Sequence, residues 1–191
     1  MKGHILINTC LKSVLTIILA CLLGSSAFAA QDDPHLDDLF EKLLETDDAR
    51  RAKVIEDAIW ETWLDAESPS INLMMDRSLV ALNGEDMPTA LSLLNAIVDL
   101  RPDFAEGWNK RASLFFLMED YDQSLVDIQK VLELEPRHFG ALSGLSSILS
   151  AYGEHKKALE AFEQALAVNP YLPDREKRLR ILTDKAEGQK I

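Results

Sequence analysis

The side chains that most often carry out enzyme chemistry are few and scattered in this sequence. His35, His138 and His155 are the histidines beyond the first thirty residues, and no two of them share a metal-ligand spacing on one element. None stands beside a plausible nucleophile. The sequence has no Gly-rich phosphate loop, no EF-hand spacing and no HExxH motif. We therefore expect no catalytic residue, no metal site and no cofactor, and a protein that is not an enzyme.

Paired carboxylates are the other groups with chemical potential. They lie close to the expected starts of helices, where negative charge interacts favourably with the helix dipole. Capping and solvation therefore explain them better than acid–base catalysis does. The pairs are Asp32–Asp33, Asp37–Asp38 and Asp47–Asp48.

The first thirty residues differ from the rest of the chain. Two lysines are their only charges, an apolar stretch covers residues 14–23, and the small residues of GSSAFAA follow. This order is typical of a secretory signal peptide, with Ala27 and Ala29 forming the cleavage site. We expect residues 1–29 to be removed and the mature protein to be periplasmic or secreted.

Two other interpretations of this segment stay open. A membrane anchor would need about 20 apolar residues, more than the run contains. ILAC, ending at Cys21, loosely resembles a lipobox and would give a lipoprotein. Because Cys10 and Cys21 are the only cysteines, a chain cleaved after Ala29 has no thiol for a disulfide or a metal.

The charge balance limits the class of partner. The whole chain carries a net charge of −12, and removal of the leader deletes two lysines and no acid. Such an acidic protein is a poor partner for nucleic acid or anionic lipid. We expect neither nucleic acid binding nor a membrane span after the leader is removed; the oligomeric state is left open.

A repeat of 34 residues organises the rest of the chain. Pro102, Pro136 and Pro170 stand 34 residues apart, each after an apolar helical segment. Other columns keep the same register, which is the test for a repeat architecture. Small residues occupy two columns, Ser78, Ala112 and Ser146, and Ala90, Ser124 and Ala158; a bulky column holds Met74, Trp108 and Leu142.

These columns resemble the tetratricopeptide repeat (TPR) family, from Ile71 to about Pro173. The resemblance implies an all-α solenoid of helical hairpins, in which small residues let two helices approach closely. The expected repeats are 71–104, 105–138 and 139–172, within a region spanning 70–173.

Helix starts support this register. Asp103 followed by Glu106 reads as a capping box that opens the first helix of the second repeat. Asp86 and Asp120 stand where the second helices of repeats one and two should begin. The third repeat has no acidic cap at residues 137–138.

Turns and arginines add two further expectations. Gly84 and Gly153 mark the turns between paired helices. Arg77 and Arg111 occupy a column where many TPR sequences have leucine. We expect each to lay its stem on the core and pair locally, Arg111 with Asp127 on the facing helix.

A capping helix is expected after the repeats, because a stack of repeats exposes apolar surface at its ends. Residues 174–191 follow Pro173 and begin with Asp174, a proline and N-cap signal, and they place Leu179, Ile181 and Leu182 on one helix.

Residues 30–69 are expected to form a helical hairpin upstream, with helices at 34–44 and 47–64 capped by Asp33 or Thr46. Whether this is a degenerate fourth repeat or an unrelated hairpin is left open, because Leu44 and Glu56 occupy its small columns. Trp60 and Trp63 are expected to pack against the first repeat; a surface hot spot is the alternative. The apolar set is Phe40, Leu43, Ile55, Ile59, Trp60 and Trp63.

The concave face of a TPR solenoid is the expected binding groove, because the first helix of each pair lines it. Its lining is neutral, with amides and hydroxyls that can bond an extended partner and apolar patches that can accept its side chains. The lysine columns of the TPR carboxylate clamp are not matched. The candidate partner-binding residues are Asn72, Met75, Leu79, Asn83, Asn109, Ser113, Phe116, Leu117, Ser143, Ser147 and Ser150.

Three segments, LDDLFEKLL, DFAEGWNKRASLFF and EPRHFGALSGL, together with the leader, resemble short periplasmic TPR proteins of alphaproteobacteria. That resemblance implies a scaffold or adaptor that binds a protein or peptide partner and supports cell-envelope integrity or assembly. An accessory subunit of an envelope enzyme, such as one that remodels peptidoglycan, and a lipid-anchored assembly factor are the alternatives.

Overall fold

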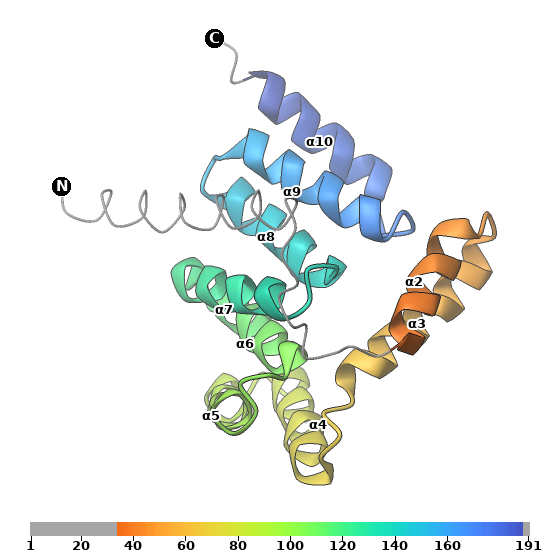
Figure 1. Cartoon of the computed structure of the whole chain (residues 1–191). Helices are drawn as coiled ribbons and strands as arrows, with labels where there is room; N and C mark the ends of the chain where they lie inside the picture. The colour runs from red at the N-terminus through yellow and green to blue at the C-terminus, as the bar shows by residue number, and fades with distance from the viewer. Residues whose placement is uncertain (1–33, 189–191) are drawn as a thin grey trace, which may run out of the picture.

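The computed structural model describes residues 34–188, and within this range every regular element is an α-helix (Figure 1). The predicted all-α repeat architecture is confirmed. The expected leader, its cleavage site and Asp33 lie outside the described residues. No helix within the described range is long and apolar enough to cross a membrane. The helices are α2 (Pro34–Glu45), α3 (Ala49–Leu64), α4 (Pro69–Asn83), α5 (Met87–Leu100), α6 (Ala105–Leu117), α7 (Tyr121–Leu134), α8 (Phe139–Ala151), α9 (His155–Val168) and α10 (Arg175–Gly188).

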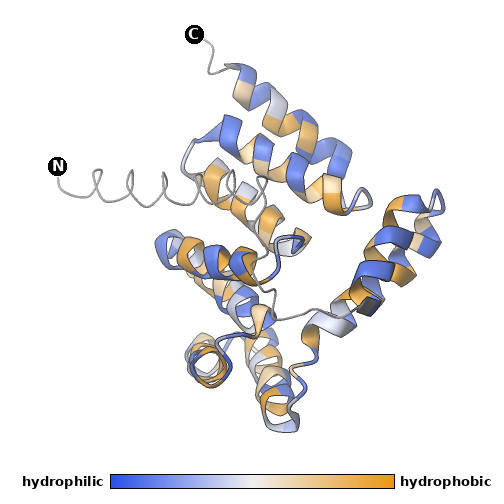
Figure 2. Cartoon of the chain, in the orientation of Figure 1, coloured by the Kyte–Doolittle hydropathy of each residue, from blue (hydrophilic) through white to orange (hydrophobic). Residues whose placement is uncertain are grey.

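Three helix pairs, α4 with α5, α6 with α7 and α8 with α9, stack one after another and are followed by α10 (Figure 1). Polar and apolar residues alternate along each helix, as expected for helices that bury one face (Figure 2). The small side chains expected between paired helices are all buried: Ser78, Ala90, Ala112, Ser124, Ser146 and Ala158.

Two of these serines also bond across the helix pair. The hydroxyl of Ser124 donates to the carbonyl of Ala112, and that of Ser146 to the carbonyl of Ala158, each at 2.7 Å. A small side chain therefore both permits the close approach and satisfies its own polar group.

The turns inside the pairs repeat the same backbone geometry. Glu85, Glu119 and Gly153, spaced 34 residues apart, have φ angles of 58°, 60° and 76°. This left-handed conformation favours glycine, yet two of the three turns use glutamate. The predicted turn residue Gly84 has φ −89° and is the C-cap of α4, so the residue after it makes the turn.

Side-chain caps begin several helices. Asp86 and Asp120 accept from the backbone N–H of Thr89 and Gln123, as predicted. His138 opens α8 by accepting from the Ala141 N–H at 3.1 Å, a cap that no acidic residue signalled.

The capping box expected at Asp103 and Glu106 was wrong. Phe104 is the N-cap of α6 without a side-chain bond, and Asp103 pairs with Arg101 instead. The side chain of Glu106 points into the interior instead, where it is buried and its carboxylate contacts His138.

The α2–α3 hairpin does not stack on the first repeat. Its buried residues belong to one hydrophobic cluster with those of repeats two and three, whereas α4 and α5 share a separate cluster. The prediction that Trp60 and Trp63 pack against repeat one was therefore wrong: both contact His138 and Phe139 at the start of α8. The expected Thr46 cap was also wrong, because Asp48 caps α3 by accepting from the Arg50 N–H.

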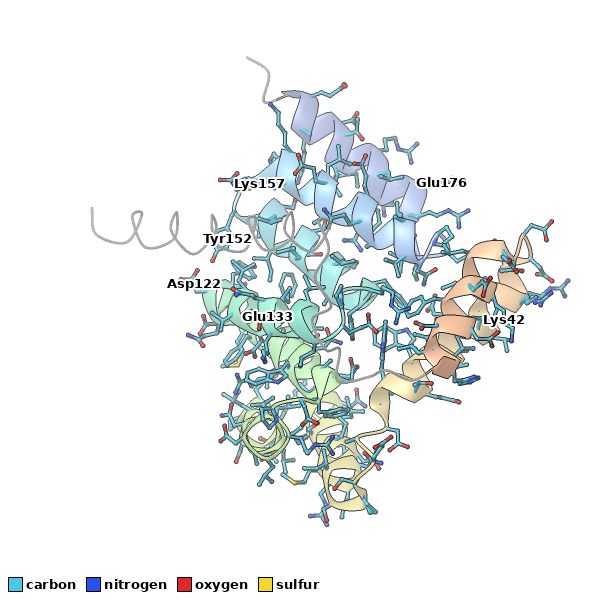
Figure 3. The ribbon with its side chains drawn as sticks, viewed as in Figure 1. Lys42, Asp122, Glu133, Tyr152, Lys157 and Glu176 are labelled. Atoms are coloured by element: carbon cyan, nitrogen blue, oxygen red, sulfur yellow. The ribbon has the colours of Figure 1, made fainter. Side chains whose placement is uncertain are left out.

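The hairpin lies along the edge of the solenoid where one repeat connects to the next. Asp37 pairs with Arg137 at 2.6 Å, and Glu56 accepts from the side-chain amide of Asn169 at 2.8 Å. The opposite edge carries the turns inside the pairs, where Tyr152 donates to Asp122 at 2.6 Å (Figure 3).

At the C-terminal end, α10 packs on α9 as a capping helix. Leu182 is buried and Leu179 packs on the core, whereas Ile181, expected in the same apolar set, is 42% exposed. Arg178 lies over the ring of Phe162 and donates to the hydroxyl of Ser143.

Candidate functional site

The structure gathers most of the predicted groove residues into two separate hollows rather than one continuous groove. The first, which we call the neutral hollow, has a volume of about 240 Å³ and lies between α6, α7 and α8. It is lined by Asn109, Ala112, Ser113, Phe116, Leu117, Ser124, Ile128, Gly140, Ala141, Gly144, Ser147 and Ile148.

The neutral hollow has room for a ligand because the first turns of α8 present only small residues to it. Gly140, Ala141 and Gly144 form this part of the α8 wall, which Ser147 and Ile148 continue, and a Cβ built on Gly144 would meet only Ile128 Cδ1, at 3.4 Å. Phe116 and Ile128 supply apolar surface from the other two helices. The space fits an apolar side chain of a partner, and no lining residue is charged.

The second hollow, which we call the acidic hollow, has a volume of about 360 Å³ and lies between α3 and α4. Three of the predicted residues, Asn72, Met75 and Leu79, come to it from α4. Its lining is Glu61, Leu64, Asp65, Asn72, Met75, Asp76 and Leu79.

Sequence reasoning missed the α3 side of this hollow, because α3 was expected to stack on repeat one. It also placed some residues in the groove that line neither hollow. Asn83 is exposed near the end of α4, Ser143 is engaged by Arg178, and Ser150 lies near the end of α8.

A cluster of buried polar side chains joins α6, α8 and the hairpin next to the neutral hollow. Both Glu106 and His138 are fully buried, and His138 Nε2 donates to Glu106 Oε2 at 2.9 Å. Because His138 Nδ1 accepts from the Ala141 N–H, Nε2 is the nitrogen that carries the proton in this bond. Asn109 donates to the same carboxylate at 2.8 Å, and Lys110 Nζ lies 2.7 Å from its other oxygen.

Opposing effects set the ionisation of this carboxylate. Burial alone would raise the pKa of Glu106, but the hydrogen bond from His138 and the ammonium group of Lys110 bring the pKa below its usual value. Glu106 is therefore a charged structural anchor at neutral pH. Its contacts with Asn109, Lys110 and His138 tie α6 to the start of α8.

The hairpin ends the neutral hollow at Gly140. A Cβ added to Gly140 would stand 2.7 Å from a carbon of the Trp60 ring, so only glycine admits this ring. Trp63 stacks on the His138 ring with centroids 4.1 Å apart. A partner segment that follows the neutral hollow toward the start of α8 would therefore meet the hairpin.

The predicted pairing of Arg111 with Asp127 is confirmed. Its guanidinium makes two bonds to the buried carboxylate of Asp127, at 2.8 and 2.7 Å, and one to Asn95. It also lies over the ring of Trp108. Arg111 therefore orders repeat two and is not available to a ligand.

No cluster of three or more metal-ligating side chains occurs among residues 34–188. The fold and the two hollows define a class of protein: a solenoid of helical hairpins with open hollows that can accept side chains of a partner. The family model for the tetratricopeptide repeat matches residues 105–138 and 140–171.

Similar proteins identify the family. A TPR repeat-containing protein of Rhizobium etli is 39% identical over 156 residues, which cover 82% of this chain and 76% of that protein. The chain belongs to the TPR family. The small glutamine-rich tetratricopeptide repeat-containing protein 2 of Saccharomyces cerevisiae is 24% identical over 150 residues, 77% of this chain and 42% of its own length.

Solved structures share the fold at low identity. The TPR2B domain of yeast Sti1, in a complex with pHsp70, has a TM-score of 0.57 and 19% identity, covering 64% of this chain and all of that chain. The MamA protein has a TM-score of 0.57 and 17% identity, covering 80% of this chain and 81% of its own. A TPR protein with these surfaces mediates protein–protein interaction.

Proposed function

We propose that this chain is an exported adaptor that binds a segment of a protein partner in the neutral hollow and supports cell-envelope integrity or assembly. The observation that carries the binding proposal is the α8 wall of Gly140, Ala141 and Gly144, which leaves room for a side chain next to Phe116 and Ile128. An apolar side chain of the partner would fill this space.

The chemistry of the lining indicates how such a segment would be held. Ser113 and Ser147 use their hydroxyl protons on carbonyls of their own helices, which leaves their oxygens as acceptors for a partner. Ser147 also receives a bond from Arg178. The hollow offers no basic lining side chain, so a carboxylate is not the anchor that it would select.

Site-specific photo-crosslinking in cells tests the site. A photoreactive residue at Ser113 or Phe116 should capture a protein partner, whereas one at Val126, which is 49% exposed on α7, should not. Gly144→Leu should abolish the capture because its side chain would fill the hollow, and Gly144→Ala is the matched control. Capture from Val126 alone would contradict the proposal.

The export part of the proposal rests on the leader pattern of residues 1–29 and on the resemblance to periplasmic TPR proteins. Mass spectrometry of the mature N terminus tests it. A first residue of Ala30 would support a cleaved leader, and an acylated Cys21 would establish the lipid-anchored form instead. An uncleaved chain would contradict both.

A further inference from the structure

The acidic hollow has an apolar floor below a charged rim. Met75, which is 2% exposed, and Leu79 form the floor from α4, and Leu64 adds to it from α3. Glu61, Asp65 and Asp76 stand at the rim. Both helices therefore contribute apolar and acidic groups to one space.

The rim contains no basic side chain of its own. None of the lining residues is basic, and Glu61 and Asp76 form no ion pair within residues 34–188. Asp65 accepts from the Asn72 side-chain amide at 2.9 Å and from the Glu67 N–H at 2.8 Å, and these two bonds lower its pKa. Asp65 is therefore a charged carboxylate at neutral pH, and it stands with two further acidic side chains at the rim.

Both walls of the hollow are fixed in place. In the last turns of α3, Trp60 packs on Gly140 and Trp63 stacks on His138. Just after α3 ends, Arg101 Nη1 donates to the Ala66 carbonyl at 2.6 Å, and the Ala66 N–H donates to Asn72 Oδ1 of α4 at 2.9 Å. The space between α3 and α4 is therefore built by contacts on both sides.

We propose that the acidic hollow is a second binding site, which takes a lysine or arginine side chain together with a neighbouring aliphatic side chain from a polypeptide partner. The aliphatic group would cover Met75 and Leu79, and the cation would reach the rim carboxylates. An apolar floor selects against a fully hydrated cation, and three carboxylates select against an acidic segment. This site shares no residue with the neutral hollow.

A synthetic peptide tests the proposal. The probe is an acetylated and amidated peptide of sequence GSKLKLSG, titrated into the full chain and followed by calorimetry and by amide NMR shifts. We expect it to shift the amides of Asn72, Met75 and Leu79 and to bind more weakly as salt increases. The glutamate counterpart, GSELELSG, should produce no such shifts.

Matched variants separate a site from general attraction to an acidic protein. Replacing Glu61 and Asp76 by Gln and Asn should weaken binding about twofold to fivefold for each charge removed. The control replaces two acids away from the hollow, Glu85→Gln and Asp99→Asn, and should leave binding unchanged. Equal weakening by both pairs, or peptide shifts outside the hollow, would overturn the proposal.

A third variant tests the role of the hairpin wall. Gly140→Ala should weaken peptide binding by displacing Trp60 and with it α3, whereas Gly144→Ala should not. Circular dichroism should show that both variants remain folded. Since the crosslinking experiment reports on the neutral hollow alone, either site can fail without the other.

Discussion

A pair of glycines in α8 gives the sharpest test of how the hairpin docks. Gly140 and Gly144 lie one helical turn apart in the same helix, and each can be replaced by alanine. At Gly144 the new Cβ would find ordinary space, with Ile128 Cδ1 at 3.4 Å. At Gly140 it would stand 2.7 Å from one carbon of Trp60, and 3.3 Å from another and from His138 Cε1.

The two substitutions should change stability in opposite directions. Alanine in place of glycine stabilises a helix interior by about 0.8–1 kcal/mol, and less at the second residue of a helix, where Gly140 stands. Trp60 has little room to retreat, because it packs edge-on against Trp63 and Phe139 with centroids 5.2 Å away in each case. Overpacking of this kind costs about 1–3 kcal/mol. We expect Gly144→Ala to gain about 0.5–1 kcal/mol and Gly140→Ala to lose about 1–2 kcal/mol.

Urea unfolding followed by circular dichroism measures both values, and a double-mutant cycle identifies the cause. In a Trp60→Ala background the ring is absent, so Gly140→Ala should no longer be destabilising. If Gly140→Ala is as stable as Gly144→Ala in the wild-type background, the seating of Trp60 on α8 is refuted. A loss that persists without the ring would refute the proposed cause.

Three further substitutions test the fold. Glu106→Gln should weaken the loss of folding stability that occurs as the pH falls. The folded pKa of Glu106 lies below the usual 4.5, so its contribution to stability is present above that pH and is lost as the pH falls through the folded pKa. Urea unfolding midpoints at pH 3–6 measure this dependence, and the same pH dependence in both proteins would contradict the prediction. Glu119→Gly should stabilise by up to about 1 kcal/mol in thermal unfolding, because glycine adopts the φ of 60° without strain, as Gly153 does in repeat three; a lower Tm would refute this. Arg111→Met should cost about 3–5 kcal/mol in urea unfolding by leaving the carboxylate of Asp127 buried and unpaired, with Arg111→Lys intermediate, and a loss below about 1 kcal/mol would contradict the buried pair.

The repeats were predictable because their packing is local. Ser124 and Ala112 meet across a single turn, and the carboxylates of Asp86 and Asp120 bond to amides three residues ahead. Contacts at such short separations leave a periodic trace in the sequence. The 34-residue spacing therefore predicted the helix pairs and most of their ends.

The position of the hairpin was not predictable, because it depends on contacts between distant residues. The sequence indicated that Trp60 and Trp63 are buried, but it did not indicate which surface they pack against. Glu106 matched a local capping pattern, yet its histidine partner is 32 residues away. A glycine at position 140, near the start of an expected helix, was the one sequence signal of the contact.

The same limit applied to the candidate site. Residues on α4, α6 and α8 could be chosen from the register of the repeat, but the division into two hollows required the position of α3. Ser143 looked available from its column, whereas Arg178 of α10 engages its hydroxyl. Competition from flanking helices therefore removes positions that the repeat alone would expose.

The docking of the hairpin on residues 137–171 has a consequence for the order of folding. A simple solenoid can assemble repeat by repeat, because each repeat contacts only its neighbours. Here Asp37 must find Arg137, 100 residues later, and the carbonyl of Thr46 must find the hydroxyl of Tyr171, 125 residues later. The first helices of the described chain to leave the ribosome are thus among the last to reach their final neighbours, and we expect the hairpin to unfold together with repeat three, on which it docks.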